Sequence, residues 1–213
     1  MFNRMFDKKL QLGGAIALAS LLLPAAASAQ QAVPAAKRMN TLGAENSLLA
    51  QRVGAWDVTE TVRATPGAAP TANHYRVTRK MIGSFLQEIA VPEPGAADPS
   101  FRRIYYLSFN RVEGRWKYVS LVTNSPVGLM PAASFGPSQN RTITLTFEPF
   151  AVAGPGGTVT GQMLRMDEII TLQDANHDHS EERFRMADGS GKMWVAFRYD
   201  YVRRGAQVSQ RHK

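Results

Sequence analysis

Apolar and polar residues alternate along most of the chain beyond position 55, and this period of two predicts β-strands. The stretches 56–62, 75–81 and 141–147 show the pattern most clearly, because each places mainly apolar side chains at every second position. In 141–147 the opposite face carries threonines, which strands favour. These stretches therefore predict strands that bury one face.

Turn-forming residues divide the rest of the chain into hairpins. Val112-Glu113-Gly114 separates two aromatic and β-branched stretches, and the last third reads as a meander. Ser125–Gln139 contains three prolines and two glycines, so we expect a surface loop there. The further strands are predicted at 85–91, 103–110, 115–124, 162–173, 180–186 and 192–203.

One short helix is expected before the first strand. Thr41 is a suitable N-cap, and Leu48, Leu49 and Val53 follow at helical spacing, which predicts a helix over about 42–52. No helices alternate with the later strands, and the short turns favour antiparallel neighbours. A long all-β antiparallel sheet has to split into a sandwich or close on itself, and the hairpin connections favour an up-and-down barrel of about 8–10 strands.

The N-terminal segment has the pattern of a signal peptide. Basic residues precede an apolar run over 12–23, and Ala27-Ser28-Ala29 then forms a cleavage pattern, so residues 1–29 are expected to be removed. The apolar run is too short to span a membrane, and we expect a periplasmic or secreted protein. Beyond it we expect a flexible leader at 30–40, a barrel domain at 41–204 and a disordered tail at 205–213.

Composition removes several classes of function. The chain has 213 residues and no cysteine, which excludes a disulfide framework, a thiolate metal site and a cysteine nucleophile. Removal of residues 1–29 would lower the net charge from +8 to +6. The basic residues are scattered and form no stripe with stacking aromatics, so a nucleic acid is not an expected partner.

The order of short motifs resembles the lipocalin-like (calycin) barrels, and a bacterial group of unknown function among them. A short helix leads into Gly54-Ala-Trp56, and the resemblance covers most of 41–204. It implies a barrel with an internal cavity and no established activity. The stretches that carry it further are Met81–Leu86, Asn110–Gly114, Asp174–His179 and Phe197–Arg203. Nitrobindin-like haem barrels share the Gly-x-Trp strand but add glycines and a proximal histidine that this chain lacks, so no haem or other cofactor is expected.

Glu168 is the most unusual residue of the predicted strands. It shares a face with Met166 and Ile170, and a carboxylate in an apolar row is costly to bury unless it is paired. Arg198 shares a face with Trp194 on the last strand. If both faces line the barrel, Glu168 and Arg198 could form a polar anchor for a ligand; the alternative places Glu168 at the rim or in solvent.

Three further positions are candidates for ligand contact. Trp56 is expected in the core beside the helix, with ligand contact as a secondary role, and Glu60 lies on the same face and could reach the lumen. Tyr106, with Tyr105 and Tyr118, fits either wall packing or a lumen lined with hydroxyl groups. The adjacent acids at 167–168 and 181–182 point to opposite faces of a strand, which disfavours a two-carboxylate mechanism.

His177-Asp178-His179 is the sharpest local cluster. Imidazole and carboxylate groups suit Zn²⁺, but the three residues fall on a predicted turn, and Asp, Asn and His are ordinary turn formers. The sequence leaves both interpretations open and does not by itself assign a metal.

Three hypotheses for function follow. The first is an exported barrel that binds a small apolar or amphipathic molecule in its lumen. The second is a structural or interaction module whose barrel is only a scaffold. The third is an envelope enzyme that uses Glu168 as an acid or base. The volume and lining of the barrel interior distinguish them.

Overall fold

The computed structural model describes residues 34, 37, 42–152, 162–187 and 189–205. The expected signal peptide, leader and C-terminal tail therefore lie outside the described residues, apart from Pro34, Lys37 and Gly205. In the described part, no helix is long and apolar enough to cross a membrane.

The described residues form one short helix, α2, and an antiparallel sheet. Helix α2 covers Ala44–Ala50, within the predicted range of 42–52. The strands are β1 Gly54–Val62, β2 Thr71–Ile82, β3 Phe85–Pro92, β4 Arg103–Asn110, β5 Arg115–Val122, β6 Met130–Ala133, β7 Thr142–Phe147, β8 Phe150–Val152, β9 Gln162–Leu172, β10 His177–Met186 and β11 Met193–Arg203.

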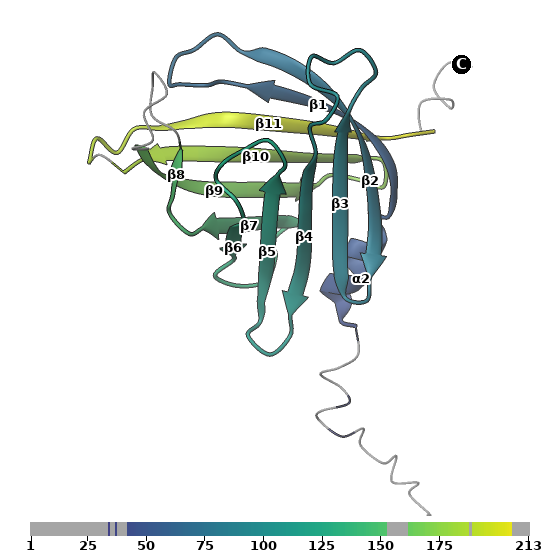
Figure 1. Cartoon of the computed structure of the whole chain (residues 1–213). Helices are drawn as coiled ribbons and strands as arrows, with labels where there is room; N and C mark the ends of the chain where they lie inside the picture. The colour runs from purple at the N-terminus through teal and green to yellow at the C-terminus, as the bar shows by residue number, and fades with distance from the viewer. Residues whose placement is uncertain (1–33, 35–36, 38–41, 153–161, 188, 206–213) are drawn as a thin grey trace, which may run out of the picture. The chain divides into compact units, whose positions relative to one another are not determined.

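The sheet closes into a barrel, as the hairpin pattern predicted (Figure 1). Its strand order within the described residues is β10-β11-β1-β2-β3-β4-β5-β6-β7-β9, and β9 pairs back with β10. Closure leaves no open edge in this ring, and β8 adds to β9. The fold is thus all-β and antiparallel, with ten strands in the ring.

Two strands and one strand start differ from the prediction. The expected loop Ser125–Gln139 contains β6, and β8 was not predicted, because strands of three or four residues are too short to show a period. Strand β10 begins at His177, so the His177–His179 cluster lies on a strand and its placement on a turn was wrong. The predicted hairpin around Val112-Glu113-Gly114 is confirmed as β4–β5.

The barrel core is packed at the end that α2 covers. Helix α2 contacts β2, β3 and β4, and its Leu49 is buried in the main apolar cluster with Trp116 and Ile143. Trp56 has no exposed surface and donates its indole N–H to the carbonyl oxygen of Arg52 at 3.1 Å. This end is therefore filled, and the space for a ligand lies toward the other end.

Candidate functional site

A cavity of about 440 Å³ lies inside the barrel, away from α2. Its size falls in the range of small-molecule sites. Nine strands and two loops contribute to its wall. The apolar part of the lining consists of Val62, Phe101, Val122, Val127, Met130, Phe150, Val152, Met166, Phe184 and Phe197.

A carboxylate from β1 forms one polar side of this cavity. Glu60 is buried, and its Oε2 accepts hydrogen bonds from Asn73 Nδ2 at 2.7 Å and Tyr75 OH at 3.0 Å. Asn73 and Tyr75 lie on the neighbouring strand β2 and also line the cavity. The pKa of Tyr75 is raised because the hydroxyl is buried and faces the Glu60 carboxylate. Tyr75 therefore remains a hydrogen-bond donor to Glu60.

A second pair of carboxylates lies where β9 and β10 meet. Glu168 and Glu182 are directly opposite each other in the strand register, so their side chains share the inward face. Glu182 lines the cavity and accepts a hydrogen bond from Tyr199 OH at 3.2 Å. Glu168 is 3% exposed, and its Oε2 has no hydrogen-bond partner among the described residues.

Burial and proximity perturb both of these carboxyl groups. Burial, and next the charge of Glu182, raise the pKa of Glu168 to about 8, against the opposing effects of Arg103 and a Tyr118 hydrogen bond. Burial raises the pKa of Glu182 to about 7, with Arg103 opposing the rise and Glu60 adding to it. Near neutral pH the pair therefore holds protons that an exposed pair would have lost.

A chain of buried ion pairs runs between the cavity and α2. Arg79 Nη1 is 2.6 Å from Asp178 Oδ2, and its Nε is 2.7 Å from Glu88 Oε2. Arg52 extends the chain toward α2, with Nη1 2.9 Å from Asp178 Oδ1, and Arg103 extends it toward the cavity, with Nη2 3.0 Å from Glu88 Oε1. Although burial opposes ionisation, Arg79 and Arg103 hold the pKa of Glu88 below its usual value. These charges compensate one another.

The predicted site residues separate into inward and outward groups. Glu60 lines the cavity, as expected for a lumen residue. Trp56 lies in the core at the packed end, under the guanidinium of Arg79, and takes no part in the cavity lining. Tyr106 points outward, where Gln87 Nε2 donates to its hydroxyl at 2.5 Å, while its neighbour Tyr105 is buried inside. Tyr106 is therefore not among the residues that line the cavity, and its position fits the wall-packing alternative.

The expected Glu168–Arg198 pair does not form. Arg198 has 43% of its side chain exposed on the outside of the barrel, where its Nη2 is 2.8 Å from Glu181 Oε1. A register shift opposite Glu182/Arg183 interrupts the alternation of β11, so Trp194 points inward with Phe184 while Arg198 points outward. The predicted apolar row around Glu168, in contrast, is confirmed by the burial of Met166 and Ile170.

Each histidine of the His177–His179 cluster lies against a carboxylate outside the cluster. Because all three residues lie on β10, the two histidines face outward and Asp178 faces inward. His177 Nδ1 is 2.9 Å from Asp174 Oδ2, and His179 Nδ1 is 2.8 Å from Asp200 Oδ1. Across the part of the chain that the structure describes, no group of three potential ligands is arranged to hold a metal ion.

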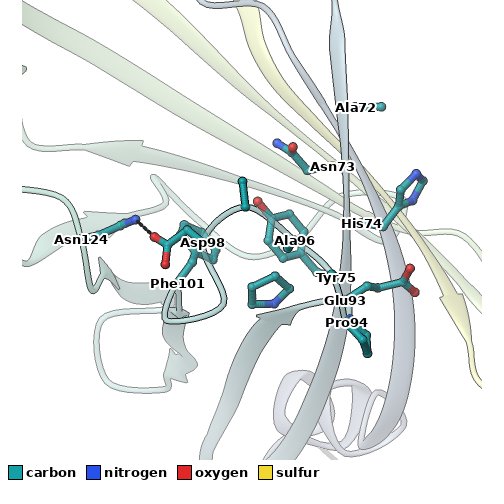
Figure 2. Close-up of a pocket in the computed structure, with 13 residues that line it drawn as sticks. Ala72, Asn73, His74, Tyr75, Glu93, Pro94, Ala96, Asp98, Phe101 and Asn124 are labelled. Atoms are coloured by element: carbon teal, nitrogen blue, oxygen red, sulfur yellow. Dashed lines mark hydrogen bonds between the residues drawn. The ribbon is translucent and has the colours of Figure 1, made fainter.

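A second hollow, of about 460 Å³, lies on the outside of the barrel beside β2 and the loop that follows β3 (Figure 2). In this loop Asp98 accepts hydrogen bonds from Ser100 Oγ at 2.6 Å and from Asn124 Nδ2 at 2.5 Å. The rings of Tyr75 and Phe101 are in tilted contact, with centroids 5.3 Å apart, and both residues line the hollow and the cavity. These two rings therefore form a wall between the lumen and the surface.

Glu182 is the functional candidate that the sequence did not single out. The sequence pairs it with the adjacent Glu181, whose side chain points to the other face of the strand. Its partner across the sheet is Glu168, and that pairing depends on the register of β9 and β10. The alternation within each strand places each acid on the inward face, but only the pairing register of β9 and β10 brings the two acids opposite each other.

Comparisons with known proteins give a family and a distant structural likeness. The crystal structure of Rv2717c from M. tuberculosis is similar, with a TM-score of 0.47 and 13% sequence identity over 76% of this chain and 99% of that chain. No curated protein matches the chain. The family described as "Protein of unknown function (DUF1579)" matches residues 41–203, which includes α2 and every described strand. The chain therefore belongs to the DUF1579 family.

Proposed function

We propose that this protein binds a small amphipathic molecule in the barrel lumen. The cavity of about 440 Å³ carries the proposal, because its lining is apolar on much of its surface and polar where Glu60, Glu182 and Tyr199 gather. Such a division, with few placed polar groups in a mainly apolar pocket, is the usual composition of a ligand site. It favours a ligand with one polar end and an apolar body.

The other two hypotheses receive less support from the interior. A barrel that serves only as a scaffold can fill its lumen with side chains, as this one does around Trp116 near α2, but not around Met130. The enzyme hypothesis needs Glu168 at the substrate, whereas the carboxyl groups that line the cavity are those of Glu60 and Glu182.

Export and ancestry belong to the same proposal. The basic, apolar and small-residue pattern of residues 1–29 supports a periplasmic or secreted location. The short helix that leads into the Gly54-x-Trp56 strand of a closed barrel supports a relationship to the lipocalin-like barrels. An exported binding protein would meet its ligand in the envelope or outside the cell.

Binding of N-phenyl-1-naphthylamine, a neutral apolar fluorophore, tests the proposal. The protein is expected to bind the probe and enhance its fluorescence. Val122→Phe should weaken binding by about tenfold or more, because Val122 lines the cavity and the larger ring would fill it. Leu121→Phe is the matched control, since Leu121 is the adjacent residue and faces the other side of β5.

Two results would contradict lumen binding. One is the absence of probe binding together with no small molecule in native mass spectra of the purified protein. The other is equal affinity of the two phenylalanine variants for the probe, which would place the bound fluorophore outside the cavity.

A further inference from the structure

The polar side of the cavity has more carboxylates than cations. Glu60 on β1 and Glu182 on β10 line the cavity, and Glu168 on β9 lies directly opposite Glu182. None of the three forms an ion pair within the described ranges. The one arginine that lines the cavity is Arg103, and its Nη2 is already 3.0 Å from Glu88 and 2.8 Å from Tyr201 OH. The three carboxylates therefore lack a counter-charge of their own.

Hydrogen bonding leaves acceptor capacity unused in this place. Glu168 is nine-tenths or more buried, and its Oε2 has no partner among the residues described. A buried carboxylate oxygen without a donor is costly, and a group that donates to it would be bound favourably. Glu182 has a bond from Tyr199 OH to Oε1 and faces the open cavity. A donor that entered the cavity would meet the carboxyl oxygens of Glu60 and Glu182, and Glu168 lies directly behind them, opposite Glu182 in the strand register.

The walls around the carboxylates are aromatic. Tyr75, Phe101, Tyr118, Phe197 and Tyr199 all line the cavity. Aromatic faces attract cations, and the attraction is greater where water is excluded. An ammonium group fits both the ring faces and the carboxyl oxygens, whereas an anion would meet the carboxyl groups of Glu60 and Glu182.

We propose that the lumen ligand is a small organic cation, an amine whose ammonium group lies between Glu60 and Glu182 and whose apolar body extends along Met130 and Phe150. This inference rests on the proposed lumen binding and names the chemical class of the ligand. The ammonium donates hydrogen bonds to the carboxylates, and the apolar body fills the part of the cavity that apolar side chains line.

The proposal carries a pH dependence of known sign. The pKa of Glu182 is raised to about 7 and that of Glu168 to about 8, so both carboxyls lose protons as the pH rises from 6 to 8.5. An alkylamine remains charged over this range, because its pKa resembles that of lysine. The groups that act on these two carboxyls from the neighbouring strands are Glu60, Glu88, Arg103, Tyr118 and Tyr199. Affinity for the amine should therefore rise with pH.

Displacement of N-phenyl-1-naphthylamine by octylamine, octanol and octanoate tests the charge of the ligand. The three competitors have a similar apolar chain and differ in the charge of the polar end. At pH 8.5 in phosphate buffer, octylamine should displace the probe at concentrations about tenfold lower than octanol or octanoate. At pH 6 this advantage should shrink, because Glu168 and Glu182 are then protonated.

Two variants localise the effect. Glu182→Gln keeps the shape and should remove most of the difference between octylamine and octanol at pH 8.5, because the amide carries no charge. Glu181→Gln is the matched control, since Glu181 is adjacent, faces outward and pairs with Arg183 and Arg198, so it should behave as the wild type.

The outcomes separate this inference from the proposed function. If octanol or octanoate displaces the probe as well as octylamine does, the proposal that the ligand is a cation is wrong, while the proposal of lumen binding stands. If octylamine retains its advantage in Glu182→Gln, its ammonium group lies elsewhere and the placement is overturned. If the probe itself does not bind, the proposed function fails first.

Discussion

Glu168 is a buried carboxyl group that opposes the stability of the fold once it ionises. Replacement of Glu168 by Gln is expected to stabilise the protein at pH 8.5, by on the order of 2 kcal/mol, because a neutral amide needs no buried charge. The folded-state pKa of about 8 exceeds the ordinary value of 4.5. The stability that the protonated Glu168 carboxyl contributes to the folded protein is therefore complete below about pH 4.5, and it is lost as the pH rises through 8.

Urea unfolding at pH 5.5 and pH 8.5 measures this effect as a difference between variant and wild type. The Gln variant should gain in relative stability at the higher pH. Asp167→Asn is the control, because Asp167 is partly exposed and accepts a hydrogen bond from Thr146 Oγ1 on the outside of the sheet. A gain for Glu168→Gln that is equal at both pH values would contradict the raised pKa.

Gly54 explains, at the same scale, why the Gly-x-Trp motif was informative. Gly54 has a φ of +139°, and a Cβ placed there would lie 2.7 Å from Arg203 Nη1. Arg203 packs over the Trp56 ring and donates to the carbonyl oxygen of Val53 at 2.7 Å. The motif thus encodes a close approach of the last strand to the first, which the residue types alone did not reveal.

Elements with a long regular pattern were predictable, and irregular ones were not. The alternation of β7 and the turn of the β4–β5 hairpin gave correct strands from local information. Strand β11 shows the limit, because a register shift at residue level reverses the faces on its two sides. That shift moved Arg198 out of the predicted site and could not be seen without the partner strand.

The end of α2 is attached to the barrel by charge. Asp178 on β10 pairs with Arg52, just beyond the helix, and with Arg79 on β2. Asp178→Asn should lower the free energy of unfolding by about 3 kcal/mol, because the buried Arg52 guanidinium loses its counter-charge and Arg79 keeps only Glu88. Urea unfolding near neutral pH measures this loss.

Asp200→Asn is the matched control for this pair, since Asp200 is exposed on β11 and bonds to His179. Its effect should be within about 0.5 kcal/mol. Equal losses in the two variants would show that the buried chain of ion pairs contributes no more than a surface contact.

At the scale of the whole molecule, closure of the barrel assembles a site that no single strand contains. Glu60 and Glu168 were recognised from their own strands as acids in apolar rows. Glu182 was not, because its role depends on facing Glu168 across β9 and β10. Fold class follows from periodicity, whereas the composition of the lumen follows from strand order and register, which the sequence does not state.

The mature protein is expected to lack residues 1–29. When the full chain is expressed in a Gram-negative bacterium, the periplasmic fraction should contain a protein that begins at Gln30, because Ala27-Ser28-Ala29 forms the cleavage pattern. N-terminal sequencing and intact mass measure this. Ala29→Arg should block cleavage, and Ala36→Arg, beyond the cleavage point, should leave it unchanged. A cytoplasmic product that retains Met1 would contradict export, and the lumen would then have to be supplied with its ligand inside the cell.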